Sequence, residues 1–189
     1  RLSDDLATPY GLQVAEQHHR EVIDVITKTA LVRLHDDDGD GFFEKQEVAA
    51  DGWGHTDDYH DWAVGLPKTG DGGYYVALPC QQDDRDPAKA RLRGQGLKLI
   101  PREPTDDDPR RFRVEPFCGG LRFPMGLALN RLGDLFCSDN QGNYTPFNEL
   151  NHLVAGKRYG FINKLEVKPG FSPPFQPAAV DIPHPWSRS

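Results

Sequence analysis

The clearest chemistry in this 189-residue chain lies in the stretch DDDGDGFFEKQE, from Asp36 to Glu47. Aspartates occupy its first, third and fifth positions, and Gly41 follows at the sixth, where a calcium loop must turn sharply. A backbone carbonyl at the seventh position and carboxylates at the ninth and twelfth complete the pattern. Because calcium is a hard cation that takes several oxygen ligands, the spacing predicts a calcium site formed by Asp36, Asp38, Asp40, Phe42, Glu44 and Glu47.

Two kinds of structure can carry such a loop. The preceding run EVIDVITKTALVRL places apolar residues near one face of a helix, but its many β-branched residues favour strands. Gly52 and Gly54 would end any following helix within about two turns. No second loop of this kind follows in the sequence. We therefore predict a loop between strands rather than a helical calcium sensor, with an acidic turn that binds no metal as the alternative.

Composition narrows the class of protein. The 19 glycines and 16 prolines favour many turns and short strands, and 37% hydrophobic residues suffice for a core. A net charge of −7 argues against a nucleic-acid partner, which would need a basic face. No apolar run is long enough for a transmembrane helix. No signal peptide is visible, and the abrupt start leaves room for a lost leader or earlier domain.

The three cysteines have no paired spacing that would indicate a zinc site or a disulfide framework. Each of them, Cys80, Cys118 and Cys137, follows an apolar residue or a proline. This setting predicts buried free thiols, with one disulfide bridge left open as the alternative.

Short apolar segments separated by turns predict a succession of strands. The predicted strands are 9–15, 22–27, 30–35, 46–52, 62–66, 74–79, 96–100, 112–117, 126–130 and 134–139. The adjacent histidines at 18 and 19 belong to a surface turn rather than a metal pair. The charged, proline-broken stretches 81–96 and 101–111 read as solvated insertions, and the tail from Pro169 as an extended connector.

A weak internal repeat organises these strands. The pair WAVGL and GGYYVAL resembles the pair MGLALN and GDLFCSD, and PYGLQVA with EVIDVIT is a looser third copy. The spacing of roughly 50 to 65 residues fits propeller blades with insertions. We predict an all-β chain, a partial β-propeller of about three to four blades, each a four-stranded antiparallel sheet. Residues 1–189 would be one propeller domain or a propeller fragment, completed by other segments, because so few blades do not close a usual ring.

Several motifs together resemble a known family. The segment GLRFPMGLALNRLGDLFCSDNQGNYTPFNELNHLVAGKRYGF resembles the signature region of the soluble glucose/sorbosone dehydrogenases, which are β-propellers dependent on pyrroloquinoline quinone (PQQ). The whole chain is similar to large bacterial relatives often labelled membrane-bound dehydrogenase or haem-binding-domain proteins. The shared features are a strand running into a D-x-DGDG loop, a histidine before the next blade, an Arg-x-Pro-x-Gly segment, a D-N-Q-G loop and an N-E-L-N-H segment.

The resemblance implies roles for individual residues. His60 would be the general base that takes a hydroxyl proton while hydride passes to the quinone, a task that suits imidazole because its unperturbed pKa is about 6.5. Arg122 would contact the acidic cofactor, because a guanidinium pairs well with carboxylates. A second, active-site calcium would take oxygens from the loop of Asp139, Asn140, Gln141, Gly142 and Asn143, and Glu149 and Asn151 match polar residues that follow it.

The same resemblance implies a setting for the whole protein. Its cofactors would be Ca²⁺ and PQQ, its substrate a sugar or another alcohol, and its electron acceptor a cytochrome. It would work in the periplasm or outside the cell.

Two departures from the family pattern support a different function. Phe123 stands where the soluble glucose enzymes carry asparagine, and the D-N-Q-G-N-Y-T-P loop differs from theirs in acid content and spacing. The alternative is therefore a non-catalytic, calcium-stabilised propeller that binds carbohydrate or protein partners. In that case His60 would cap a loop, and Arg122 would pair with a nearby carboxylate where two blades meet.

Overall fold

In the computed structural model the described residues are 3–4, 6–80, 86–143, 145–164 and 166–183. Their regular structure consists of strands, with no helix among them. Sheet A contains β1 (Gly11–Gln17), β2 (Arg20–Ile26), β3 (Ala30–His35) and β4 (Lys45–Asp51). Sheet B contains β5 (Val64–Lys68), β6 (Tyr74–Ala77), β7 (Gln95–Pro101) and β8 (Phe112–Gly119). Sheet C contains β9 (Gly126–Leu129), β10 (Leu135–Asp139), β11 (Asn148–Leu153) and β12 (Val180–Ile182).

Each sheet is a meander in which consecutive strands pair antiparallel. The turns have the conformations that tight hairpins need. His18 and His19, for example, both have positive φ angles, 52° and 63°, and close a two-residue turn between Gln17 and Arg20. The predicted surface turn at these histidines is therefore confirmed.

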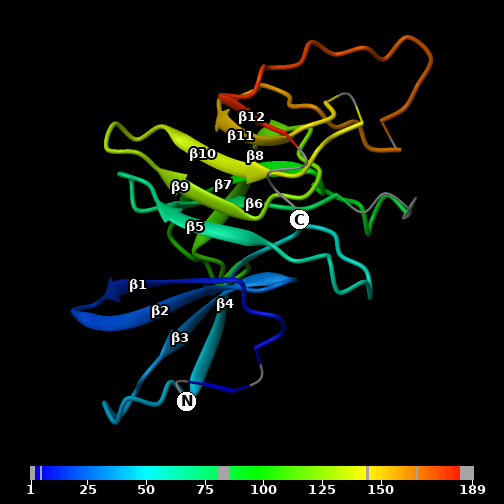
Figure 1. Cartoon of the computed structure of the whole chain (residues 1–189). Coiled ribbons are helices and arrows are strands. Elements are labelled where there is room, and N and C mark those ends of the chain that lie inside the picture. The colour runs from blue at the N-terminus through cyan, green and yellow to red at the C-terminus, as the bar shows by residue number, and fades with distance from the viewer. Residues whose placement is uncertain (1–2, 5, 81–85, 144, 165, 184–189) are drawn as a thin grey trace.

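The three sheets follow one another around a common axis (Figure 1). Strand β5 contacts both β1 and β9, so the first strand of each sheet lies on the inside. This arrangement confirms the predicted partial β-propeller, with three four-stranded blades in the described residues. It also excludes the helical calcium sensor. Within the same residues, no helix is long and apolar enough to span a bilayer.

Two hydrophobic cores hold the blades together. The first packs sheet A against sheet B through Ile26, Leu31, Ala49, Ala50, Trp53, Ala63, Leu66, Tyr74, Val76, Leu78, Leu97, Leu99 and Phe112. The second packs sheet B against sheet C through Trp62, Val64, Ala77, Cys118, Leu121, Leu135, Cys137, Leu153 and Tyr159. Neighbouring blades thus bury their facing surfaces against each other, as propeller blades do.

A buried polar group crosses the first of these interfaces. Arg33 on β3 donates two hydrogen bonds of 2.7 Å to the carboxylate of Asp24 on β2. Tyr74 on β6 donates a third, also 2.7 Å, to the same carboxylate. The charged pair is therefore satisfied inside the interface, as a buried ion pair must be to persist.

The meander fixes which loops share an end of the molecule. The β2–β3 turn, the β4–β5 connection, the β8–β9 connection and the β10–β11 loop all leave the sheets at one end, because strand direction alternates. We call this the connector end. The β3–β4, β5–β6, β7–β8 and β9–β10 turns lie at the opposite end, which we call the hairpin end.

The structure differs from the sequence prediction in three segments. The NELNHL segment is strand β11, although it was not predicted as one, because three of its buried residues, Asn148, Glu149 and Asn151, are polar. Part of the proline-rich tail pairs with it as β12 rather than serving only as a connector. The 86–94 segment is not fully solvated, since Ala90 and Arg93 are buried. Residues 81–85 of the predicted insertion lie outside the described residues.

The cysteines agree with their predicted state. All three are buried thiols, and none of them forms a disulfide within the described part of the chain. Burial raises the pKa of both Cys80 and Cys118 to about 12. Thiols that stay protonated in apolar surroundings have a packing role.

Candidate active site and calcium loop

The predicted calcium loop gathers four carboxylates at the hairpin end of sheet A. One oxygen from each of Asp36, Asp38, Asp40 and Glu44 lies within 4.8 Å of the others. The backbone N–H groups of Gly39 and Gly41 donate to Asp36 at 2.6 and 2.9 Å, and these bonds hold the pKa of that carboxyl below its ordinary value. A convergent set of anionic oxygens on a tight turn fits a calcium ion.

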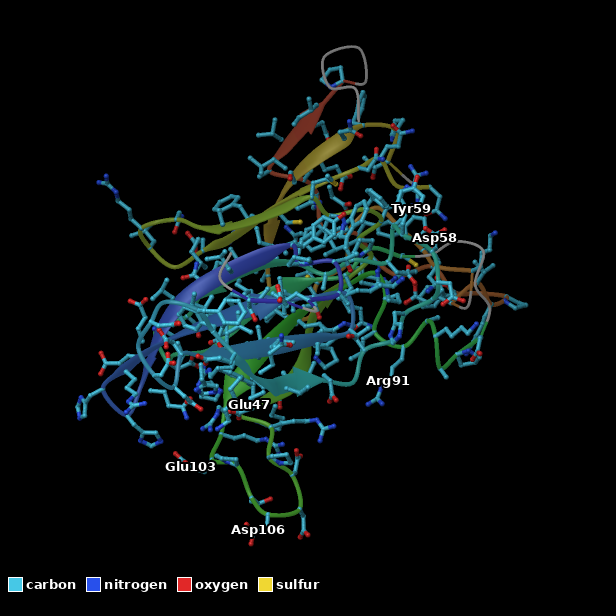
Figure 2. The ribbon with its side chains drawn as sticks, turned by 90° about the horizontal axis from the view of Figure 1, so that it is seen from below. Glu47, Asp58, Tyr59, Arg91, Glu103 and Asp106 are labelled. Carbon is cyan, nitrogen blue, oxygen red and sulfur yellow. The ribbon has the colours of Figure 1, made fainter. Side chains whose placement is uncertain are left out.

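Glu47, the predicted twelfth-position ligand, is not in that cluster. It lies on β4, where its carboxylate is 2.7 Å from Arg111 Nε and 3.2 Å from His35 Nε2. Figure 2 shows Glu47 near the base of the projecting β7–β8 loop that carries Glu103 and Asp106. The structure therefore places Glu47 in an ion pair between sheets A and B, outside the cluster of four carboxylates.

The second group of predicted residues is at the connector end. His60 belongs to the β4–β5 connection, which two hydrogen bonds hold against the β2–β3 turn. Trp53 Nε1 donates to Lys28 O at 2.9 Å, and Lys28 Nζ donates to Asp58 O at 2.8 Å. The calcium loop begins at the other end of β3, whose six residues span about 20 Å. A metal in the calcium loop would thus act on the fold and not on chemistry at His60.

The His60 side chain has a carboxylate and three aromatic rings around it. Asp58 Oδ1 lies 2.8 Å from His60 Nδ1 and also accepts the backbone N–H of His60 at 2.8 Å. The imidazole lies 3.7 Å from the Tyr59 ring, 5.7 Å from the Trp62 ring and 5.6 Å from the Phe123 ring, measured between centroids. The ring remains about one third exposed, so a substrate can reach it.

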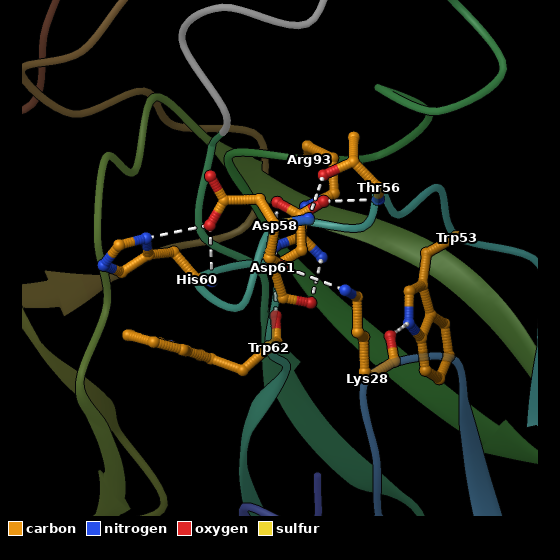
Figure 3. Close-up of polar contacts among 8 residues, drawn as sticks. All are labelled: Lys28, Trp53, Thr56, Asp58, His60, Asp61, Trp62 and Arg93. Atoms are coloured by element: carbon orange, nitrogen blue, oxygen red, sulfur yellow. Dashed lines mark hydrogen bonds and ion pairs between the residues drawn. The ribbon is translucent and has the colours of Figure 1, made fainter. Parts of the chain in front are cut away.

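A buried ion pair between Asp61 and Arg93 holds this segment (Figure 3). Arg93 donates to the carbonyl of Trp62 at 3.1 Å and lies 3.6 Å from Asp61, whose other oxygen accepts the backbone N–H of Thr56. Burial lowers the pKa of Arg93 to about 10. The sequence prediction missed Arg93, because its charge-rich neighbourhood gave no sign of burial.

The predicted cofactor residues come from the β8–β9 connection and the β10–β11 loop. Asp139 at the end of β10 accepts the backbone N–H groups of Arg122, Phe123 and Asn140 at 3.0, 2.6 and 2.8 Å. Arg122 in turn donates from Nη1 to the carbonyl of Gln141 at 2.7 Å. These bonds join the Arg-Phe-Pro turn to the Asp-Asn-Gln-Gly loop, so the structure brings the two motifs together.

Individual residues of the loop have distinct roles. Asn143 makes two bonds with the backbone of Ile162, and a Cβ on Gly142 would stand 1.9 Å from the carbonyl oxygen of Gly160. Both residues therefore shape the loop. Asn140 accepts the backbone N–H of Gln141 at 2.9 Å. The buried Gln141 Oε1 has no hydrogen-bond partner among the described residues, which leaves an acceptor oxygen inside the site.

Two buried carboxylates make this end of sheet C strongly polar. Asp139 is paired in register with Glu149 across β10 and β11. Burial raises the pKa of Asp139 to about 7, against the effect of its three backbone donors, and burial also raises the pKa of Glu149. Asn151 donates to Glu149 at 2.8 Å, and its own Oδ1 atom is buried without a partner in the described part of the chain. Such an oxygen-rich interior suits a cation.

The aromatic contacts connect the two halves of the site. Phe123 follows Arg122 and packs 4.6 Å from Trp62 as well as 5.6 Å from His60, between ring centroids. The backbone N–H of Cys80, in the β6–β7 connection, also donates to Arg122 O at 2.8 Å. Residues about 60 positions apart in sequence thus meet at the connector end of sheets B and C.

Comparison with known proteins gives matches among solved structures. No protein-family model matches the chain, and no curated protein sequence matches it. The chain is similar to a protein assigned as an oxidoreductase (glucose dehydrogenase) from Thermus thermophilus, at 25% identity and a TM-score of 0.60, over 97% of this chain and 59% of that one. Two further glucose dehydrogenase structures match 84% of the chain, at 21% and 17% identity and TM-scores of 0.52 and 0.50.

These matches are evidence about the fold of the chain and not about its activity. The chain spans between 53% and 65% of the length of the three proteins. Similarity at these sequence identities shows that the strands are arranged alike. It does not show a shared activity, which depends on particular side chains. The chain therefore shares the β-propeller fold of part of a glucose dehydrogenase.

Proposed function

We propose that this chain is the part of a PQQ-dependent sugar or alcohol dehydrogenase that carries the general base and one wall of the cofactor site. The observation that carries the proposal is the convergence of His60, Arg122 and the 139–143 loop at the connector end, through the Phe123–His60 and Arg122–Gln141 contacts. The whole enzyme would act in the periplasm or outside the cell and pass electrons to a cytochrome, as in the large bacterial relatives that the sequence resembles.

The Arg122 guanidinium and the oxygens of the 139–143 loop would suit an acidic quinone held beside a calcium ion. Arg122 would bind a cofactor carboxylate, because a guanidinium offers donors in a planar fork and the Gln141 carbonyl orients it. The buried Gln141 Oε1 and the loop's backbone carbonyls are the hard oxygens that calcium takes. When bound, PQQ supplies the hydride acceptor.

The chain's own part in the reaction is to place a base. His60 accepts the proton of the substrate hydroxyl at a ring nitrogen, and Tyr59, Trp62 and Phe123 limit the positions of that ring. Their apolar surfaces also exclude water from one side of the imidazole. Phe123 thus takes a position that a polar residue holds in the soluble glucose enzymes and gives the site an apolar wall.

The proposal is tested by titrating PQQ into calcium-loaded protein and following cofactor absorbance and thermal shift. We expect saturable binding that requires calcium. Arg122→Ala should weaken binding about tenfold to a hundredfold, because charge-assisted hydrogen bonds contribute about 1.5–3 kcal/mol. Arg131→Ala serves as the control, since Arg131 is exposed in the β9–β10 turn at the hairpin end. Absence of saturable binding to folded protein, or equal binding by both variants, contradicts the proposal.

A second function, ligand binding without chemistry, is favoured by one observation. The Phe123 ring packs against both Trp62 and His60 and forms an aromatic surface next to the exposed Tyr59. Aromatic surfaces of this kind also bind sugars without reaction. Detection of sugar or alcohol oxidation that disappears in folded His60→Ala protein would exclude this second function.

A further inference from the structure

We propose that Asp58 is a positioning residue for His60, which holds the imidazole with its proton on Nδ1 and leaves Nε2 as the nitrogen that accepts the substrate proton. The inference rests on the proposed function for the identity of the base. The tautomer and orientation of the ring, however, are properties of the chain that can be measured without turnover.

The first support is the pair of hydrogen bonds at a single carboxylate oxygen. Asp58 Oδ1 is 2.8 Å from His60 Nδ1 and 2.8 Å from the His60 backbone nitrogen, which donates to it. These contacts, led by the backbone bond, lower the pKa of Asp58, so the carboxylate is ionised at neutral pH. An ionised carboxylate only accepts hydrogen bonds, so Nδ1 must be the protonated nitrogen of a neutral ring.

The second support is that Asp58 is itself held in place. Its backbone N–H donates to Thr56 Oγ1 at 3.1 Å, and its carbonyl accepts Lys28 Nζ at 2.8 Å. The carbonyl also accepts the backbone N–H of Asp61 at 3.2 Å, and Asp61 faces Arg93 in the buried pair described above. The Asp58 carboxylate is thus carried by a short segment tied to sheet A through Lys28 and to sheet B through Arg93.

The third support is the packing of the imidazole. The Tyr59 ring lies 3.7 Å from it, while Trp62 and Phe123 lie at 5.7 and 5.6 Å, so tilting the ring out of its plane would disturb the aromatic contacts. A half-turn about the Cβ–Cγ bond restores that plane but would break the Nδ1 bond. Figure 3 shows the second ring nitrogen turned away from Asp58. The base is therefore oriented by polar and apolar contacts that agree, which is what a preorganised site requires.

The neighbouring Asp57 provides a matched control. It has the same charge and is exposed like Asp58, but among the described residues the carboxylate that contacts His60 is that of Asp58. Asp57→Ala and Asp58→Ala remove the same charge from the same loop. Differences between the two variants therefore report the hydrogen bond and not the loss of a negative charge.

The test is ¹⁵N NMR of the imidazole nitrogens at a pH where the ring is neutral, with His60→Ala used to assign the signals. The wild-type chain and Asp57→Ala should show the Nδ1–H tautomer for His60. Asp58→Ala should shift the signals toward a mixture of tautomers, because the acceptor that selects one form is gone. Nε2–H as the main tautomer of the wild type, or an unchanged spectrum in Asp58→Ala, would overturn the inference. Unchanged circular dichroism shows that each variant is folded.

Kinetics separates this inference from the proposed function. If the PQQ-loaded chain oxidises a sugar or alcohol, Asp58→Ala should lower kcat about tenfold with a smaller change in KM, and Asp57→Ala should change neither. The predicted NMR result without turnover by the wild type would support the positioning of His60 while the enzyme proposal failed. Turnover that is equal in both variants would count against Asp58 while the enzyme proposal survived.

Discussion

At the scale of single residues, the most unusual group in the site is the Asp139 carboxyl. It is buried, yet it joins two loops by accepting three backbone N–H groups, from Arg122, Phe123 and Asn140. Those donors favour the charged form, but the loss of hydration favours the neutral form and outweighs them, so the pKa rises to about 7. A change in the charge of Asp139 is thereby coupled to the stability of the turn that carries Arg122.

The raised pKa predicts how stability depends on pH. The folded chain keeps the Asp139 proton up to about pH 7, whereas the unfolded chain releases it near 3.8. The contribution of the protonated Asp139 carboxyl to the free energy of unfolding is therefore complete below pH 3.8 and is lost as pH rises to 7. The contribution of this group to the free energy of unfolding should fall by about 3 kcal/mol between pH 5 and pH 8.

Urea denaturation at the two pH values measures this contribution. In Asp139→Asn the fall should be smaller by that amount, because the amide does not titrate. Both proteins are compared in chelator, so that calcium release does not add to the difference. Equal pH dependence in the wild type and the variant would show that Asp139 titrates normally.

At the scale of elements, the β3–β4 turn is a self-contained unit. Its carboxylates accept backbone N–H groups of the same turn, as Asp36 does from Gly39 and Gly41. Without a cation, four carboxylates within 4.8 Å repel one another, so the turn is the part of sheet A with the most to gain from calcium. Because this turn lies far from His60, calcium bound there would stabilise the fold and would not take part in chemistry at His60.

We predict that calcium raises the melting temperature of the wild-type chain and that Asp38→Ala removes most of the rise. A ligand at a hundred times its dissociation constant stabilises the folded state by about 2.7 kcal/mol. Thermal unfolding with calcium and with chelator checks this. Asp106→Ala is the matched control, because Asp106 is an exposed acid on another turn of the hairpin end (Figure 2). A calcium effect of wild-type size in Asp38→Ala would show that the turn binds no calcium.

A Glu47 variant can be tested in the same thermal unfolding experiment. Because its carboxylate pairs with Arg111 and His35, Glu47→Gln should keep the calcium-dependent rise while lowering stability in chelator. Loss of the calcium effect in Glu47→Gln would mean that this side chain leaves its ion pair to bind the metal.

At the scale of the whole molecule, the close approach of the inner strands decides how the blades stack. A Cβ on Gly11 of β1 would stand 2.4 Å from the carbonyl oxygen of Gly65 on β5. A Cβ on Gly65 would stand 2.4 Å from the Leu127 side chain on β9. The inner edges of three blades therefore touch at positions where there is no room for a side chain.

Gly11→Ala should lower the free energy of unfolding by about 1–3 kcal/mol, because the methyl group meets a backbone atom that only a shift of the blade can clear. Gly70→Ala is the control, since a Cβ there would meet nothing within 4 Å. Its effect should stay within about 0.5 kcal/mol. Urea denaturation measures both variants. Equal stability of the two would mean that sheets A and B approach less closely than the structure indicates.

The sequence by itself determined the features that depend on neighbours along the chain. Alternating apolar residues and glycine-rich turns indicated most strands of sheets A and B, and the hairpin of β9 and β10. The spacing of Asp36, Asp38 and Asp40 predicted converging carboxylates, because a tight turn brings alternate residues together by itself. The location of chemistry at the His60 and Arg122 motifs stays a prediction.

Only the tertiary structure decided which of these residues meet. His60, Arg122 and the 139–143 loop belong to connections that the alternating strands bring to one end, and their contacts bridge sheets B and C. The structure alone also showed that Glu47 pairs with Arg111 in the β7–β8 loop and that Arg93 is buried. Such contacts join residues far apart in the chain and depend on how the blades stack, so no local pattern of residues encodes them.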